Sequence, residues 1–218
     1  EDYWKSTQQL RAGIGSARRL VDIPEWPAER RHEIFLGQME DLPERLGGYF
    51  DIAFSMACFE HIHHLGLALE KMYAALRPGG RLLSMFSPIW SAYDGHHLPQ
   101  ILDEEGRDIR KSILPHIPPW GHLLLSPPDM YHHLKREGLS SELASRAVYA
   151  IYYHPQINRL KTEDYARYIA LSPFKIVQLI GTYPTQMTPE MTSALKQKYP
   201  GYTNFSNNGI LALLEKPL

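Results

Sequence analysis

Histidine is the residue type in this chain that is best suited to moving protons, and its histidines are concentrated in one region. The chain contains 11 histidines in 218 residues, and all but His32 lie between positions 61 and 154. An imidazole has an unperturbed pKa of about 6.5, so it can take a proton near neutral pH. His96, His97 and His122 are the candidates for a general base, because they follow an apolar, strand-like run in a stretch rich in aromatic side chains.

Two other interpretations of these histidines remain open. Several could meet in space around a metal ion, which would favour a His-rich metal hydrolase. The sequence gives this little motif support, because H-x-H-H at 61–64 and H-H at 96–97 are not zinc spacings and H-E-x-x-H does not occur. We therefore assign no metal ligand at this level. The third interpretation is structural, with imidazoles bonded to backbone groups, and the three can coexist.

Three aromatic side chains and one arginine are candidate substrate contacts. These aromatic residues are Trp90, Tyr93 and Trp120, and their rings can form the wall of a substrate pocket and face a cation by cation–π interaction. The competing interpretation is that they only pack in the protein interior. Arg159 can bind a carboxylate or phosphate of a substrate, or it can tie its segment to the core. Cys58 is expected to be a small buried residue, as free cysteines usually are.

The candidate residues surround one strand–helix–strand unit. Residues 50–55 (FDIAFS) and 81–86 (RLLSMF) are apolar strand-like runs, and residues 65–76 between them have apolar side chains at helical spacing. The RPGG segment at 77–80 ends the helix, since proline cannot continue it and glycine tolerates positive φ. This order predicts a parallel β-α-β crossover with ligands outside the strand carboxyl ends, at residues 55–64 and 87–97. Within the first of these segments, Glu60 is expected to cap a turn.

The rest of the chain predicts further core elements and one long insertion. Residues 88–160, which include helix candidates at 128–138 and 140–150, are too long for a simple connection and indicate a lid or binding segment. A helix at 162–171, a strand at 174–182, a helix at 189–198 and a strand at 210–215 follow. We therefore expect an α/β core of residues 1–87 and 161–218, with residues 88–160 as a helical lid or binding insertion.

The segment FDIAFSMACFEHI…ALEKMYAALRPGGRLLSMFSP resembles the central part of class I S-adenosylmethionine-dependent methyltransferases, most strongly over residues 33–88. The resemblance implies a three-layer, Rossmann-like α/β sandwich with a mostly parallel sheet. It also implies S-adenosylmethionine as cofactor and S-adenosylhomocysteine as product. By this resemblance, Ser55, Met56 and His61 contact the cofactor at a strand end. Gln38, beside Met39, stands where the family has an acid that contacts adenine.

The glycine loop of the family is not recognisable in its usual place. The only G-x-G pair in the N-terminal part, at Gly13 and Gly15, lies too close to Phe50 and follows the polar segment QQLRA rather than a strand. We expect that the first strand–helix unit of the family either lies outside these residues or was lost, so that the fold is truncated at its N-terminal side.

Composition limits the classes of partner. The net charge is −1 without a basic run, which argues against nucleic acid, and no apolar stretch approaches the roughly 20 residues that span a bilayer. The single cysteine is consistent with the reducing cytoplasm. The resulting hypothesis is methylation of an oxygen or nitrogen of a small-molecule acceptor, with proton removal by a lid histidine. The alternative is an inactive methyltransferase-like subunit that acts as a binding or scaffolding partner in a homo- or hetero-oligomer.

Overall fold

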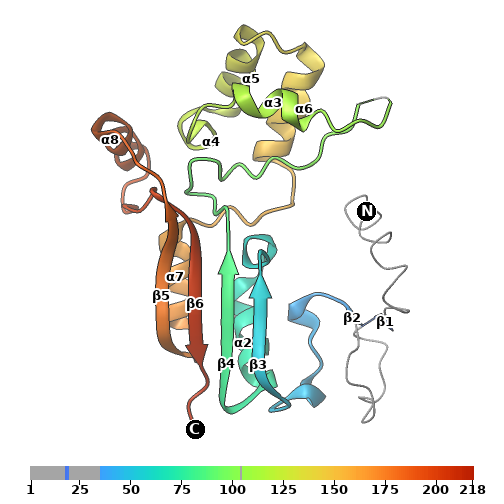
Figure 1. The fold of residues 1–218 in the computed structure, drawn as a ribbon, viewed down its shortest axis with the longest axis vertical. Coiled ribbons are helices and arrows are strands. Elements are labelled where there is room, and N and C mark those ends of the chain that lie inside the picture. Colours follow the sequence, from blue (N-terminus) through green and yellow to red (C-terminus); the bar gives the residue numbers. More distant parts are fainter. Residues whose placement is uncertain (1–17, 20–34, 104) are drawn as a thin grey trace.

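A four-stranded mixed sheet forms the centre of the protein (Figure 1). The computed structural model describes residues 18–19, 35–103 and 105–218. The strand order is β3-β4-β6-β5, where β3 and β4 pair in parallel and β6 pairs antiparallel with both β4 and β5. The strands are β3 (Phe50–Met56), β4 (Leu76–Phe86), β5 (Lys175–Pro184) and β6 (Asn207–Glu215).

The predicted β-α-β crossover is present, with α2 (Leu65–Ala75) between β3 and β4. β4 begins at Leu76, five residues before the predicted strand. The reason is the RPGG segment, which pairs with the chain end: the Gly79 amide donates to the Lys216 carbonyl at 2.8 Å. Gly79 has a φ of 78°, which glycine adopts at little cost. The helix therefore passes into extended backbone without a separate loop.

Helices α2 and α7 (Thr162–Leu171) cover one face of the sheet. Alternate residues of β4 and β6 point toward them and are buried, among them Phe86 and Leu214. Phe86 packs against Tyr165 of α7, with ring centroids 4.8 Å apart. The period-2 alternation of the strands and the helical spacing of α2 and α7 thus produce a single apolar layer.

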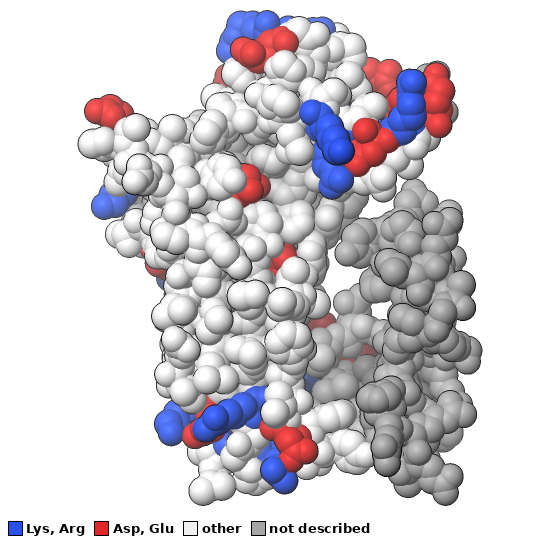
Figure 2. Space-filling view, in the orientation of Figure 1, with Lys and Arg blue, Asp and Glu red and all other residues white. Residues whose placement is uncertain are grey.

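The opposite face of the sheet is exposed and apolar. Ile52, Phe54 and Met56 point to this face and are 67%, 65% and 54% exposed. On β4, Arg81 lies in register beside Ile52, Leu83 beside Phe54 and Met85 beside Met56. Figure 2 shows this face toward the viewer as a largely uncharged surface. The α/β fold with a helical insertion is confirmed. In the described residues the main sheet has one parallel and two antiparallel strand pairs, where the resemblance implied a mostly parallel sheet, and two of the three implied layers are present.

Residues 88–160, here called the lid, contain the predicted helical insertion. Their helices are α3 (Arg110–Ile113), α4 (Gly121–Leu124), α5 (Pro127–Arg136) and α6 (Ser141–Tyr152), with a 3-10 turn η5 (Leu114–His116) after α3. The Ser140 hydroxyl caps α6 by accepting from the Leu143 amide at 3.1 Å, as the sequence pattern predicts. The lid has an apolar cluster of its own, which Leu195 of α8 (Pro189–Lys198) and Phe205 join.

A two-stranded parallel pair of β1 (Arg18–Arg19) and β2 (Phe35–Leu36) lies outside the main sheet. The short 3-10 turns η2 (Met39–Asp41) and η3 (Glu44–Leu46) connect β2 to β3. The G-x-G pair at 13–15 lies outside the described residues. Within the ranges that the structure describes, no helix has the length and apolarity needed to cross a membrane.

Candidate functional site

A pocket of about 460 Å³ opens within the lid, between its first residues after β4 and the segment 110–119. Its lining residues include Pro88, Tyr93, His96, His97, Arg110 and Lys111. The pocket therefore lies on the side predicted for ligands, next to the carboxyl end of a parallel strand. One wall carries the imidazoles of His96 and His97. The other, called the basic wall below, carries Arg110 and Lys111.

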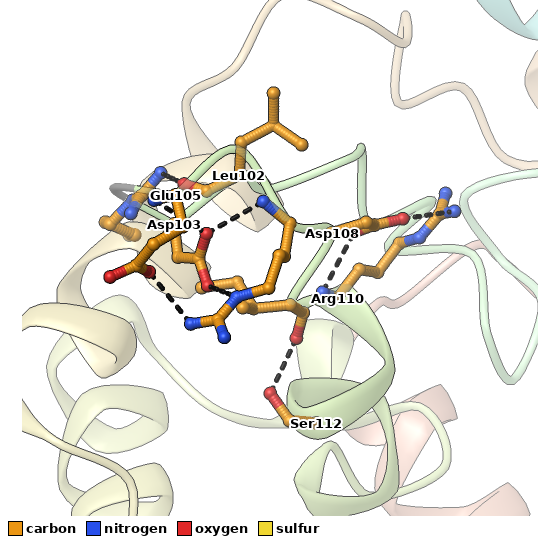
Figure 3. A network of polar contacts seen from close by, with 9 residues as sticks. Leu102, Asp103, Glu105, Asp108, Arg110 and Ser112 are labelled. Carbon is orange, nitrogen blue, oxygen red and sulfur yellow. Dashed lines mark hydrogen bonds and ion pairs between the residues drawn. The ribbon is translucent and has the colours of Figure 1, made fainter.

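The basic wall is fixed by a network of ion pairs (Figure 3). The Asp108 carboxylate accepts from both the backbone amide and the guanidinium of Arg110, each at 3.0 Å. Asp103, in the same loop, accepts from Arg107 through a backbone bond of 2.8 Å and a side-chain bond of 2.7 Å. Because Asp108 contacts the Arg110 guanidinium through one charge-assisted bond and the Arg110 backbone through another, the cation is oriented before any ligand arrives.

His96 and His122 each have one ring nitrogen bonded to the backbone, and Nδ1 of His122 has no partner among the described residues. His96 Nδ1 accepts from the Leu98 amide at 3.1 Å, so its proton resides on Nε2 and the ring is a donor. His122 Nε2 donates to the Trp90 carbonyl at 2.8 Å, and its ring packs against Trp90 with centroids 4.6 Å apart. Burial lowers the pKa of His96 to about 4 and that of His122 to about 3. Both imidazoles are therefore neutral at pH 7.

His97 has a free nitrogen. Its ring makes a hydrogen bond to the Pro88 backbone, and its buried Nδ1 has no partner among the residues that the structure describes. Burial, and then the neighbouring His61, lower the pKa of His97 to about 4. The residue has a φ of 44°, which is unusual for a side chain of this size. Two residues earlier, Gly95 packs closely against the backbone, where a Cβ would collide with the Ile89 carbonyl.

Glu60 is a site residue that the sequence interpretation missed, because it was expected to cap a turn. Its side chain is 2% exposed, and within the described ranges neither carboxylate oxygen has a hydrogen-bond partner on another residue. Desolvation raises the pKa of Glu60 to about 7. A buried carboxylate without partners is costly, so it indicates a bound cation or proton. The signal in the sequence is an acid placed directly before His61 at a strand end.

Glu60, His61 and His97 meet at one point. Each offers one ligand atom, and these three atoms lie within 4.8 Å of one another. His61 Nδ1 donates to the Gln156 carbonyl at 2.7 Å, so its Nε2 is unprotonated and lies 3.9 Å from the Glu60 carboxylate. The rings of His61 and His97 are 5.0 Å apart. This cluster can hold a metal ion, and it connects the end of β3 to the pocket.

Asn158 holds the turn that carries this cluster. Its side-chain amide donates to the Phe59 carbonyl at 2.7 Å and to the Ile62 carbonyl at 2.9 Å. Its backbone amide donates to the Glu60 carbonyl at 2.8 Å. The short 3-10 turn η4 (Phe59–His61) is thereby fixed to the last residues of the lid. No motif in the sequence marks Asn158, because its partners are about 95 positions away.

The predicted cofactor contacts occupy the end of β3 and the turn after β2. Ser55 is half-buried with its hydroxyl near Cys58, and Met56 is exposed. Gln38 is exposed at the start of η2, and Met39 packs against the apolar layer under the sheet. Cys58 is exposed, so the expectation of a buried filler was wrong. It lies beyond the last paired residue of β3, where the chain has already left the sheet.

The predicted substrate contacts divide between the pocket and the lid interior. Tyr93 lines the pocket. Trp90 and Trp120 lie in the apolar cluster of the lid, and the Trp120 indole donates to the carbonyls of Ser91 and Phe205 at 3.2 and 3.0 Å. The Arg159 guanidinium donates to the carbonyls of two lid residues, Ile151 and His154. Trp90, Trp120 and Arg159, which were predicted to bind substrate, thus make packing contacts or backbone hydrogen bonds within the protein.

Comparisons with known proteins agree with the resemblance read from the sequence. Residues 14–84 match a family model described as a methyltransferase domain. No functionally curated protein matches the sequence. Solved structures that resemble the fold include an S-adenosylmethionine-dependent methyltransferase from Mesorhizobium loti, with 16% identity, a TM-score of 0.40, and coverage of 86% of this chain and 72% of that one.

Two further structures match over smaller shares of their own length. One is the methyltransferase component of a complex with the Trm112 activator from Haloferax volcanii, with 13% identity, a TM-score of 0.40, and coverage of 88% of this chain and 65% of that one. The other is geranyl diphosphate C-methyltransferase from Streptomyces coelicolor A3(2), with 12% identity, a TM-score of 0.41, and coverage of 84% and 53%. The domain match is confined to residues 14–84, and over this part the chain is similar to methyltransferase domains.

Proposed function

We propose that the protein transfers a methyl group from S-adenosylmethionine to an oxygen or nitrogen atom of a small-molecule acceptor. The observation that carries this proposal is the pocket of about 460 Å³ beside the end of β4, in a chain with a methyltransferase domain match. Its volume is in the range of about 300–1,000 Å³ typical of small-molecule sites. The chain spans 65% of the length of the Haloferax protein, so the activity of a whole enzyme is part of the proposal.

The cofactor is proposed to lie at the carboxyl end of β3. S-adenosylmethionine would supply an activated methyl group, so the protein has mainly to align donor and acceptor and exclude water. Ser55, Met56 and His61 would contact the cofactor there, and Gln38 and Met39 would contact its adenine. The exposure of Met56 at the strand end supports this assignment, because it leaves one side of the site open for a ligand.

The acceptor is proposed to lie in the pocket, between the imidazoles and the basic wall. Arg110 and Lys111 favour an acceptor that carries a carboxylate or phosphate group. Of the three candidate bases, His97 combines a place on the pocket wall with a free ring nitrogen. We therefore assign proton removal to His97, hydrogen-bond donation to His96, and a supporting role behind the wall to His122.

The lid is proposed to form the acceptor-binding part of the protein, and residues 1–87 and 161–218 the methyltransferase core. The separate apolar cluster of the lid supports this division. The cluster also includes Leu195 of α8 and Phe205, so the C-terminal part of the core would move with the lid. Trp90, Trp120 and Arg159 would then act on the acceptor by shaping the lid, while Tyr93 contacts it.

Calorimetric titration with S-adenosylhomocysteine tests the proposal. We expect one binding event per chain, and we expect Met56→Ala to weaken it. Ile52→Ala is the matched control, because Ile52 lies on the same strand and face and is similarly exposed, but is four residues from the strand end. A protein that is folded by circular dichroism and releases no heat with S-adenosylhomocysteine would refute the cofactor site.

A second candidate function is that of a non-catalytic binding subunit, in which two copies of this chain associate. The exposed apolar face of the sheet supports it, because Ile52, Phe54 and Met56 together present more apolar surface than isolated surface residues do. We propose that a second copy of the chain covers this face of the sheet, because it would bring the same apolar surface to the contact. Light scattering on the wild-type protein and on Phe54→Lys distinguishes the cases: a dimer that dissociates in the variant supports it, and a strict monomer removes it.

A further inference from the structure

We propose that Glu60, His61 and His97 bind a divalent transition-metal ion, with Zn²⁺ the ion that suits them best. No motif in the sequence indicates such a site, because its ligands come from two segments 36 positions apart. The inference does not rest on the proposed methyl transfer. It rests on a buried carboxylate and two imidazoles that converge at the end of β3.

The carboxylate is the first argument. Glu60 is 2% exposed and, across the part of the chain that the structure describes, both of its oxygens are buried without a hydrogen-bond partner on another residue. Burying such a group is unfavourable unless a donor or a cation compensates it. Among the described residues no Lys or Arg forms an ion pair with Glu60, whereas the imidazoles of His61 and His97 each have a nitrogen within 4.8 Å of its carboxylate.

The orientation of the imidazoles is the second argument. His61 donates its Nδ1 proton to the Gln156 carbonyl, which leaves the Nε2 lone pair directed to the Glu60 side. His97 bonds to the Pro88 backbone and leaves Nδ1 without a partner among the described residues. Histidines that bind metals usually donate their second ring proton to a backbone carbonyl or carboxylate in this way, which fixes the tautomer that coordinates.

Geometry and donor type then select the ion. The three ligand atoms lie within 4.8 Å of one another, and bonds of about 2.0–2.2 Å to Zn²⁺ would draw them in by about 1 Å. Two nitrogens and one carboxylate suit Zn²⁺ and related transition metals, whereas Mg²⁺ and Ca²⁺ prefer oxygen. Three protein ligands leave a further position open. His61 is 31% exposed in its side chain, so the ion can enter from solvent.

The site has a consequence for the proposed reaction. A metal ion would use the same His97 nitrogen that proton removal requires. Metal binding and base catalysis by His97 would therefore exclude each other, and added Zn²⁺ would inhibit a methyl transfer that depends on this base. Metal binding itself would persist in a chain that has no transferase activity.

The test is calorimetric titration of the chelator-treated protein with ZnCl₂, together with metal analysis of the dialysed complex. We expect one Zn²⁺ per chain, and a loss of at least tenfold in affinity for Glu60→Gln, His61→Ala and His97→Ala. His63→Ala is the matched control, because His63 is exposed near the cluster and donates to the Pro155 carbonyl. Cys58→Ser is the second control, because an exposed thiol can bind Zn²⁺ by itself.

Both controls should bind like the wild type. Stoichiometric binding that disappears in Cys58→Ser, or that survives unchanged in the three ligand variants, would overturn the inference, as would the absence of binding. Glu60→Gln keeps the size of the buried side chain, so a folded variant is available if a histidine variant unfolds. S-adenosylhomocysteine titrations on the same samples separate the two proposals, since either ligand can fail to bind while the other binds.

Discussion

Removing the side chain of Asn158 should destabilise the protein and loosen the turn that carries the candidate site. Asn158→Ala removes two donated bonds, to the Phe59 and Ile62 carbonyls, and the oxygen that accepts from the Tyr165 hydroxyl at 2.8 Å and from the Leu160 amide at 3.1 Å. Each intramolecular hydrogen bond contributes about 1 kcal/mol net. Because the residue is half-buried and some partners regain water, we expect a loss of about 2–3 kcal/mol in the free energy of unfolding.

A double-mutant cycle isolates one part of this network. Tyr165 is fully buried, so Tyr165→Phe should cost about 1 kcal/mol by removing its bond to Asn158. In the Asn158→Ala background the hydroxyl is already without this partner, and the same change should cost little. We therefore expect the two effects to fall short of additivity by about 1 kcal/mol.

Urea unfolding followed by circular dichroism measures all four proteins, provided that the m-value is unchanged. The interpretation would be refuted if Asn158→Ala cost less than about 1 kcal/mol, or if the two substitutions were additive within about 0.3 kcal/mol. Either result would mean that the bonds are not formed in solution as the structure has them.

Three further predictions concern the lid and the strand end. Buried His122 has a pKa of about 3, below the ordinary value of about 6.5, so it binds fewer protons when folded and should by itself contribute a loss of about 2 kcal/mol in stability from pH 7 to pH 5. In unfolding titrations, the change in stability between these pH values should differ by about this amount between the wild type and a folded His122→Gln. Gly95→Ala should lower stability by about 2 kcal/mol or more, because a Cβ would overlap the Ile89 and Trp90 carbonyls; a neutral effect in thermal melts would contradict that packing. Cys58 is exposed as a residue, so it should be alkylated in the folded protein; partial desolvation of its sulfur, and then the nearby Glu60, raise the thiol pKa, so alkylation at pH 8 should be slower than for a model thiol. Mass spectrometry that finds no alkylation, or alkylation faster than that of the model thiol, would contradict this.

The elements near the centre of the chain could be predicted from the sequence because their signals are local. The apolar run at 50–55, the helical spacing at 65–76 and the RPGG stop each depend on neighbours within a few residues, and the structure confirms β3, α2 and β4. The final helix–strand–helix–strand order is confirmed for the same reason. The early start of β4 was missed because its partner, Lys216, is at the other end of the chain.

The sequence by itself determined the fold class and the side of the sheet on which the candidate residues lie. Periodicity and turn chemistry specify strands and helices, and the parallel crossover specifies which strand ends face the ligand. Only the tertiary structure decided which residues share a site. It separated His122, buried against Trp90, from His97 on the pocket wall, and it placed Glu60 and His61 beside His97. Such contacts join segments far apart in the chain, so burial and hydrogen-bond partners, which decide the chemistry of an ionisable group, follow from packing and cannot be read from local pattern.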